Sequence, residues 1–530
     1  MLSKETLMLK KVQKADAFFS KATAFFSSFL TPRKVFFILA LFLLFHGFMS
    51  ICFNNQLYRD VAGVYAWYAR EFGNGVWHDI PLSKVPVLNV FLGGLLVRCG
   101  VEPYTSVIIL SVLFMGLTLI PLYKLLKIFV PAEKAAWGCV LFTLVPKTLR
   151  FAGTGLLETT RDFFLVSALY FLFKSWNSRC RWYDWGLFGV SLGFLALARG
   201  EGIFMAGLLA VGILFRSASD WETLKRFANN ILLPAFISGV FALAVMSPVA
   251  IQNCKVTGFP VTDARMIGVL QSVPGINKCF TLKTHAVKND PRILTAEKYE
   301  KALPEDNEVL KRLRQLPENL FRGAYEPYFI LAMLGIVLLL KKRQWRKEYS
   351  FSAGYCLLVA LSFIGFSVSY RYFIFFIPLL MVFTLYALSA LLNAAEKYHF
   401  KNILLTAVAV YCVLQPLNAW LWMIKDYDAD ELNIKKFVAQ NRHRFLPPGE
   451  KRKLLIHGDP RFLFRTGEER LFHYGEPSPP AKYITGFDLM LVFKKNQKEW
   501  EDCKARRDLK QIEAPFKTIV VFAPVERKSE

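Results

Sequence analysis

Long apolar runs recur along most of this chain, and short polar segments separate them. A helix needs about 20 apolar residues to cross the hydrocarbon core of a membrane, and most of the runs approach that length. The pattern predicts eleven spans, two or three of them short, at residues 35–52, 105–123, 135–152, 159–174, 184–198, 202–215, 231–250, 325–340, 350–368, 372–392 and 402–422. The apolar run at 86–97 is too short to span and predicts a helix lying in the membrane interface.

The segments outside these runs have patterns of their own. Residues 1–34 mix lysine with phenylalanine, which predicts an amphipathic helix in a cytoplasmic N-terminal segment. Residues 291–314 form a charged, helix-favouring stretch within a long loop. From about residue 423 the composition becomes that of a soluble protein, with a helix expected at 430–442 and strands at 453–457, 489–493 and 517–522. We therefore expect a mainly α-helical membrane domain over 35–422 and a small α/β domain over 423–530.

Composition and charge support a membrane protein. Of the 530 residues 54% are apolar, far more than in a soluble domain. The net charge of +25 would suit a nucleic-acid partner, but its distribution points elsewhere. If the N-terminus is cytoplasmic, the inner segments hold 23 Lys and Arg residues and the short outer ones hold 4. This asymmetry follows the positive-inside rule and excludes a nucleic-acid role for the charge. It places the segments 53–104, 251–324 and 423–530 outside the cytoplasm.

Cysteines and short motifs add little chemistry. Cys254 and Cys279 share one outer loop and could pair in an oxidising compartment. The sequence has no CxxC pair, no HExxH and no Gly-rich phosphate loop, so it gives no support for a metal hydrolase or a nucleotide-binding protein. We expect no metal and no cofactor. The first apolar run is too long for a cleaved signal peptide, so the first span should remain as an anchor.

The first outer segment holds candidate reactive groups. Asp60 directly follows the first span, where partial desolvation strengthens a carboxylate as a proton acceptor. Its ordinary alternatives are a helix cap or a partner for Arg59. Asp79 is a second carboxylate on this segment, and Lys84 precedes the short interfacial helix. A lysine at that place either reaches lipid phosphates in general or binds one phosphate specifically.

Further charged groups fall at the outer ends of later spans. Glu158 and Asp162 share one helix face, and charges at that depth are either paired or functional. Arg199 and Glu201 stand among glycines between two apolar helices, as a self-paired turn or as the lining of a polar cavity. Arg371 precedes another span. The predicted topology brings all of these groups to one face of the membrane.

Taken in order, these elements resemble the membrane glycosyltransferases of the GT-C class, close to the family 39 type. That group includes protein O-mannosyltransferases and bacterial lipid A aminoarabinose transferases. The resemblance covers roughly residues 35–420 and rests on Asp60, Tyr65, Ala69-Arg70-Glu71, Gly75-Val76-Trp77, Lys84 with Pro86, Glu158, Leu197-Ala198-Arg199-Gly200-Glu201-Gly202, and Arg371-Tyr372 with Pro378-Leu379. Val61, Val85 and Gly200 depart from the family pattern, which blurs the subfamily and hence the sugar.

The resemblance implies a function and a set of roles. Such enzymes move a sugar from a polyprenyl-phosphate carrier to an acceptor hydroxyl outside the cytoplasm, with inversion at the anomeric carbon. Asp60 would then be the catalytic base. The substrate and its phosphate would be held by residues drawn from Lys84, Arg199, Arg371, Tyr65, Glu158, Glu201 and Asp79. The partners implied are a lipid-linked sugar donor, a lipid, glycan or protein acceptor, and the plasma (inner) membrane itself.

Two other functions share part of this pattern. A transporter or flippase of lipid-linked glycans would also be polytopic and basic on its inner side. The lopsided arrangement of seven spans before the long outer loop and four after it disfavours a transporter, because many transporters are built from matched repeats. A ligase or polymerase of surface polysaccharide would share the donor chemistry but not the early Asp motif.

The charge asymmetry predicts the topology in a form that reporter fusions can test. Alkaline phosphatase fused after Glu530 should be active, because that end lies outside the cytoplasm. The same reporter fused after Lys347, within the basic run 341–347, should be silent. Activity of the Lys347 fusion would contradict the membrane map and the placement of every candidate residue on the outer side.

Overall fold

The computed structural model describes most of the chain. The described residues are 31–53, 58, 60–76, 87–177, 180–215, 223–257, 262, 308–363, 369–397, 400–425, 429–445, 454–458, 469–470, 487–493, 497–516 and 519–525. The predicted amphipathic helix within 1–30, most of the long outer loop, and the candidate residues Asp79 and Lys84 lie outside these ranges. So does Cys279, so its pairing with Cys254 stays a prediction.

A bundle of helices makes up the membrane domain. The helices of the bundle are α2 (Pro32–Phe53), α5 (Pro103–Leu126), α6 (Ala132–Thr143), α7 (Pro146–Gly153), α8 (Glu158–Asn177), α9 (Trp182–Ala198), α10 (Gly202–Val211), α12 (Leu233–Thr257), α14 (Glu308–Gly323), α15 (Glu326–Lys341), α16 (Lys347–Ser362), α17 (Phe376–Lys397) and α18 (Lys401–Lys425). The elements between them are η1 (Val61–Tyr65), α3 (Ala66–Gly73), α4 (Val87–Arg98), η2 (Gly212–Phe215), α11 (Leu224–Phe227), η4 (Ala228–Leu232) and η8 (Tyr370–Phe375).

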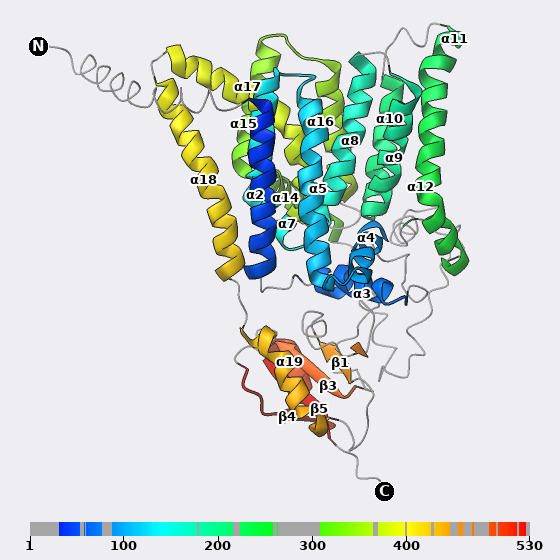
Figure 1. The fold of residues 1–530 in the computed structure, drawn as a ribbon, viewed down its shortest axis with the longest axis vertical. Helices are drawn as coiled ribbons and strands as arrows, with labels where there is room; N and C mark the ends of the chain where they lie inside the picture. Colours follow the sequence, from blue (N-terminus) through cyan, green and yellow to red (C-terminus); the bar gives the residue numbers. More distant parts are fainter. Residues whose placement is uncertain are drawn as a thin grey trace, which may run out of the picture.

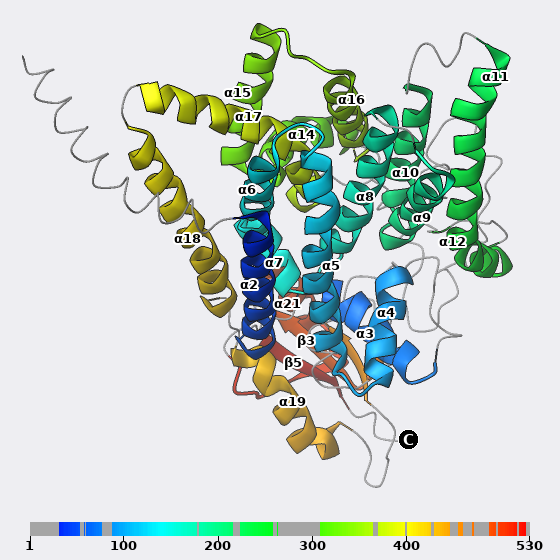
Figure 2. The same ribbon diagram turned by 45° about the horizontal axis from the view of Figure 1, so that its top comes forward.

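The long helices run up and down, so successive connections lie at opposite ends of the bundle (Figure 1). We call one end the site face. It carries α3 and α4, and the C-terminal sheet lies beyond it in Figure 1, whereas Figure 2 shows the sheet beside α3. The basic connections that follow α5, α8, α15 and α17 lie at the other end (Figure 1). The described parts of the expected outer segments 53–104 and 423–530 therefore lie at one face, together with the end of α12. The compartment which that face meets stays a prediction.

Apolar helices that could cross a membrane are clear but fewer than the predicted eleven. Five described stretches are long and apolar enough, and six are if the bent pair α14–α15 counts as one. Every other predicted span also contains a helix, but most of these helices are shorter, and α8 carries charges in its first turns. The chain is a multi-pass membrane protein, and the number eleven stays a prediction.

One predicted span is wrong as drawn. The run 135–152 is not a single helix, because it breaks between α6 and α7. Pro146 has no backbone N–H to continue the hydrogen bonds of α6, and its fixed φ suits the first turn of a new helix, which it opens. A helix expected at 86–97 is present as α4. Its place in the membrane interface stays a prediction.

A sharp bend joins α14 to α15. The two helix axes differ by 93° across a break of two residues. Tyr325 in this break has φ +63°, a backbone conformation that bulky side chains rarely adopt. The charged helix expected at 291–314 is seen only from Glu308, and it runs further than predicted, to Gly323.

A buried histidine ties three helices together. His46 of α2 accepts a hydrogen bond at Nδ1 from the indole N–H of Trp420 in α18, 3.0 Å away. Its Nε2 lies 2.9 Å from the carbonyl oxygen of Leu149 in α7. Because Nδ1 accepts, the ring proton must sit on Nε2, which donates to that carbonyl. The neutral imidazole therefore holds α7 against the first and last long helices.

The C-terminal part folds as a small mixed sheet with helices, as expected. Its strands are β1 (Leu455–Gly458), β2 (Glu469–Arg470), β3 (Leu489–Phe493), β4 (Leu509–Ile512) and β5 (Ile519–Pro524), in the order β2-β1-β3-β5-β4. The strand β1 runs parallel to β2 and β3, whereas β5 runs antiparallel to β3 and β4. Buried apolar side chains of β3 and β5 make the core, and α19 (Ala429–Asn441) and α21 (Gln497–Lys504) complete the fold.

Glycines allow α9 and α12 to pack closely, and this gives a prediction. A Cβ added to Gly189 of α9 would come 2.8 Å from Ser238 Cα of α12, so Gly189→Ala should push the helices apart and cost roughly 1–3 kcal/mol. Gly207 of α10 is a matched control, because a Cβ there would meet nothing within 4 Å. Gly207→Ala should stabilise the helix by about 0.5–1 kcal/mol.

The measurement is the thermal unfolding midpoint of the two purified variants in the same detergent. The midpoint should fall for Gly189→Ala and stay level or rise for Gly207→Ala. Equal shifts in the two variants would contradict the close packing of α9 on α12.

Candidate functional site

Asp60 lies at the start of η1, a single π-helical turn of the kind that often marks functional sites. Its side chain makes no capping hydrogen bond to that turn, so the helix-cap alternative is wrong. It pairs instead with Arg371 of η8, with Asp60 Oδ2 2.5 Å from Arg371 Nη1. The two side chains are 18% and 16% exposed. The structure thus joins the first outer segment to a residue more than three hundred positions later.

Arg199 stands at the centre of a second, buried group. Its Nη1 lies 2.7 Å from Oε1 of Glu158, the first residue of α8, and its Nε lies 2.5 Å from Oε1 of Glu201. All three side chains are buried. The self-paired turn considered for Arg199 and Glu201 is therefore present, but the same guanidinium also holds Glu158.

Arg161 of α8 extends this group deeper into the bundle. Its Nε and Nη2 donate to Oδ1 of Asp162 at 3.0 and 2.9 Å, and its Nη1 lies 3.6 Å from Glu201 Oε1. The same Nη1 donates to the carbonyl oxygen of Tyr372 at 3.2 Å. No part of Arg161 is exposed. It therefore ties α8 to both the 199–201 turn and η8.

Aromatic rings fill the space between these charges. The guanidinium carbons of Arg199 and Arg371 lie 5.1 and 5.2 Å from the centre of the Tyr372 ring, one ring that serves two cations. Arg371 also lies 5.9 Å from the Tyr58 ring. Tyr65 of η1 is buried, and burial raises the pKa of its phenol, which stays a neutral hydroxyl. The charges of Arg199 and Asp60 both act on that phenol.

We call this group the ion-pair cluster. It consists of Asp60, Glu158, Arg161, Asp162, Arg199, Glu201 and Arg371. Three cations meet four carboxylates, and two buried carboxylate oxygens, Oε2 of Glu158 and Oδ2 of Asp162, have no hydrogen-bond partner among the described residues. An unpaired oxygen at such depth is costly, so the cluster is left with capacity for a further donor.

Hydrogen bonds behind the cluster fix the first turn of α8, which presents Glu158. Ser111 of α5 donates to the carbonyl oxygen of Leu156 at 2.7 Å and shares a 2.9 Å hydrogen bond with Thr159. Asn89 of α4 donates to the Thr160 hydroxyl at 2.9 Å. The short helix α4 is thereby tied to the same turn, so the segment that follows Lys84 in sequence is anchored beside Glu158.

Most of the predicted site residues come together. Asp60, Arg371, Glu158, Arg199 and Glu201 all belong to the cluster, and Tyr65 lies beside it, whereas Asp79 and Lys84 lie outside the described residues. Arg161 was not among the predicted site residues, and Tyr372 was named only as part of a motif. The adjacent charges Arg161 and Asp162 inside an apolar helix were a usable signal. Charged side chains at membrane depth need partners of opposite charge or have a functional role.

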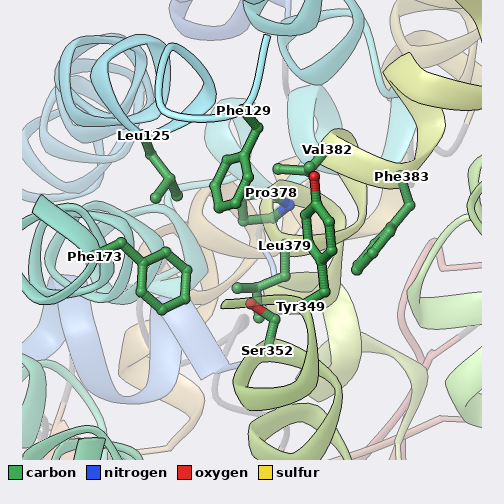
Figure 3. Close-up of a pocket in the computed structure, with 9 residues that line it drawn as sticks. All are labelled: Leu125, Phe129, Phe173, Tyr349, Ser352, Pro378, Leu379, Val382 and Phe383. Atoms are coloured by element: carbon green, nitrogen blue, oxygen red, sulfur yellow. The ribbon is translucent and has the colours of Figure 1, made fainter. Parts of the chain in front are cut away.

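A small pocket lies elsewhere in the bundle. It is lined by apolar and aromatic side chains, with the hydroxyls of Tyr349 and Ser352 as its polar atoms (Figure 3). Leu125 and Phe173, which also line it, stand near the ends of α5 and α8 that are remote from the site face. The pocket is therefore separate from the ion-pair cluster. Among the residues that the structure describes, no three His, Cys, Asp or Glu side chains gather as a metal site.

Comparison with protein families gives one match. Residues 84–251 match the family described as dolichyl-phosphate-mannose-protein mannosyltransferase. This stretch is about a third of the chain, and it contains Glu158, Arg161, Arg199 and Glu201. No curated protein matches the chain by sequence.

Solved structures share the fold over nearly the whole chain. The crystal structure of ArnT from Cupriavidus metallidurans bound to undecaprenyl phosphate is 13% identical, covers 92% of this chain and 97% of its own, and has a TM-score of 0.57. The apo form of the same protein gives 14%, the same coverage and 0.56. The Archaeoglobus fulgidus oligosaccharyltransferase with a tethered acceptor peptide is 12% identical, covers 83% of this chain and 64% of its own, and scores 0.51. These similarities concern the fold.

The family match falls on the part of the chain that supplies most of the ion-pair cluster, and the shared fold extends over both the bundle and the C-terminal part. Both findings agree with the resemblance seen in the sequence. Residues 84–251 match the mannosyltransferase family model, the fold of the chain is similar to that of ArnT over nearly its whole length, and its apolar helices are those of a multi-pass membrane protein.

Proposed function

We propose that this protein is an inverting glycosyltransferase that moves a sugar from a polyprenyl-phosphate carrier to an acceptor hydroxyl on the outer face of the membrane. The observation that carries the proposal is the ion pair between Asp60 and Arg371 at the site face. It places a carboxylate that can accept a proton directly beside a guanidinium that can hold a phosphate. This pair is also more exposed than the others in the cluster, so substrates have access to it.

The choice of donor rests on the fold and the family. A similar protein, ArnT, has been crystallised with undecaprenyl phosphate, and the matching family is described by its use of dolichyl-phosphate-mannose. A lipid phosphate needs no nucleotide-binding loop, and the sequence contains none. The apolar helices beside the site face provide a surface along which a polyprenyl tail can lie.

The proposed reaction is a single displacement. The acceptor oxygen attacks the anomeric carbon from the side opposite the phosphate, a new C–O bond forms, and the bond from the anomeric carbon to the phosphate oxygen breaks. Polyprenyl phosphate leaves with the bonding electron pair, and the hydroxyl proton passes to Asp60. Inversion at the anomeric carbon follows from attack on the opposite side. Arg371 and Lys84 offset the charge that grows on the phosphate.

The ion pair seen here implies that the partners change during the reaction. While Arg371 holds Asp60, it neutralises the carboxylate that must accept the proton. The donor phosphate is a diester with one negative charge, which grows toward two as polyprenyl phosphate leaves, so it competes increasingly for the same guanidinium during the reaction. Arg371 would then turn toward the phosphate and leave Asp60 available as the base. Arg199 is already held by Glu158 and Glu201, so its proposed share in phosphate binding is through the field of the cluster.

The substrate can be identified by a direct assay. Purified protein in lipid nanodiscs is given radiolabelled polyprenyl-phosphate sugars one at a time, together with a membrane lipid and glycan extract as acceptor. One of these donors should transfer its sugar with inversion. Absence of transfer from every lipid-linked sugar, with the protein folded, would contradict the proposed function.

Asp60→Asn tests the base. The amide keeps the shape of the carboxylate but cannot accept the proton, so turnover should fall by roughly a hundredfold or more. Donor binding should persist, because loss of the carboxylate leaves Arg371 free for the phosphate. Asp79→Asn is the control and should have a milder effect if Asp79 only shapes its loop. Wild-type turnover in a folded Asp60→Asn variant would disprove the catalytic role of Asp60.

Lys84→Ala tests phosphate binding. An interfacial lysine contributes little to packing, so the apparent KM for the donor should rise while the unfolding midpoint stays close to that of the wild type. Lys84→Arg should recover only part of the loss, because a guanidinium fork does not reproduce the point contact of an ammonium group. An unchanged donor KM in Lys84→Ala would mean that the lysine contacts lipid headgroups in general.

A further inference from the structure

We propose that Lys147 is a positioning residue for Arg371, acting through the bend between α14 and α15. The inference rests on the proposed function, in which Arg371 binds the donor phosphate. Lys147 itself lies outside the ion-pair cluster, on α7, and no contact joins it to Asp60, Glu158 or Arg199 among those described.

The ammonium group of Lys147 sits inside the bend. It donates to the carbonyl oxygen of Arg322 in the last turn of α14 and to both carboxylate oxygens of Glu326 in the first turn of α15, at 3.2 and 3.4 Å. The end of one helix exposes unsatisfied carbonyl groups and attracts a cation, whereas the start of the next favours a carboxylate. One lysine therefore stabilises both sides of a 93° change of direction.

A second contact locks the same bend from the opposite side. The hydroxyl of Tyr325, the residue with φ +63°, donates to Gln415 Oε1 at 2.8 Å and lies 2.6 Å from the Tyr411 hydroxyl. Since its one proton goes to Gln415, Tyr411 must donate to Tyr325. Both partners belong to α18. A backbone conformation that a tyrosine rarely adopts persists only where surrounding contacts impose it. Lys147 and α18 supply those contacts.

The bend in turn supports η8. A Cβ added to Gly323, the last residue of α14, would collide with Phe373 Cβ and with the carbonyl oxygen of Tyr370. The end of α14 therefore packs directly on the backbone of η8 with no side chain between them. The Tyr370 ring also lies 5.7 Å from the Lys147 ammonium nitrogen, so the lysine touches both the bend and the first residue of η8.

Arg371 follows Tyr370 directly, so any shift of η8 moves the guanidinium that pairs with Asp60. Misplacement of a binding group by about 1 Å can cost about a hundredfold in rate. Direct phosphate binding by Lys147 is the competing role. Its contacts with Arg322 and Glu326 argue against that role, because they already occupy the ammonium hydrogens.

The experiment compares Lys147→Met with Lys174→Met, both in the full-length protein in nanodiscs. Lys174 is a matched control: its Nζ lies 2.8 Å from Asp184 Oδ1, its side chain is 31% exposed against 24% for Lys147, and it stands near the end of α8 remote from the site face. The first measurement is hydrogen exchange of the backbone amides of 369–376. It needs no substrate. We expect exchange to be at least several-fold faster in Lys147→Met and unchanged in Lys174→Met.

The second measurement is steady-state transfer with the donor found in the assay above. Lys147→Met should raise the donor KM roughly tenfold or more, with the acceptor KM unchanged, whereas Lys174→Met should leave both unchanged. Lys147→Arg should restore part of the donor KM, because a cation again occupies the bend. Glu326→Gln removes the carboxylate charge but leaves the hydrogen bond from Lys147 to the Arg322 carbonyl oxygen. It should therefore speed exchange in η8 and raise the donor KM, each by less than Lys147→Met does. It serves as the test if Lys147→Met does not fold.

The outcomes are distinguishable. Unchanged exchange in η8 overturns the proposal, and a raised donor KM without faster exchange does so too, since it would mean that Lys147 binds the phosphate itself. Faster exchange in η8 from a protein that uses no lipid-linked sugar would support the positioning role and contradict the proposed function.

Discussion

The rest of the site depends on the matching of buried charges. Seven ionisable side chains gather at one end of an apolar bundle, and Arg161 has no exposed surface at all. Removing one partner from such a buried pair leaves an uncompensated charge and costs about 3–5 kcal/mol, a large part of the stability of an ordinary domain. The helices α8, η8 and the 199–201 turn must therefore keep their relative positions, or several charges lose their partners together. The cluster is rigid for electrostatic reasons, before any catalytic role is considered.

The matching of buried charges also distinguishes Arg161 and Arg199, which hold the fold together, from Arg371. Arg161 is held by two carboxylates and one carbonyl oxygen, Arg199 is held by two carboxylates, and both arginines are almost fully buried. Arg371 has a single carboxylate partner among its described ion pairs, and that pair reaches the surface. In the proposed reaction a substrate phosphate competes for Arg371 and breaks only this one partly exposed pair. It could not displace Arg199 without breaking the fold of the turn. The least buried pair of the cluster, Asp60 with Arg371, is thus the one best suited to exchange partners.

How far the sequence could predict this arrangement depended on the kind of signal. Apolar runs located the helices, because each run must be buried or face lipid. Pro146 broke one of them where hydropathy alone indicated continuity, although its missing N–H was readable. Asp60, Glu158, Arg199 and Arg371 were found because a charge at membrane depth needs a reason. Their pairing was not predictable, since Asp60 and Arg371 are brought together only by the tertiary fold. The sequence allowed a cap for Asp60, and only the geometry excluded it.

The position of η8 illustrates why such pairings escape sequence reasoning. The turn η8, which carries Arg371, packs on the end of α14 at Gly323, and Lys147 on a helix far earlier in the chain contacts both α14 and Tyr370 of η8. None of these residues carries a recognisable motif. Gly323 matters for the packing of α14 on η8 because it has no side chain. In the sequence, Lys147 is one of the few basic residues in the short outer segments. Their importance comes from a 93° bend that no local pattern encodes. An active site built where several helices end depends on the bends between them, so residues that set a bend act on the chemistry without touching the substrate.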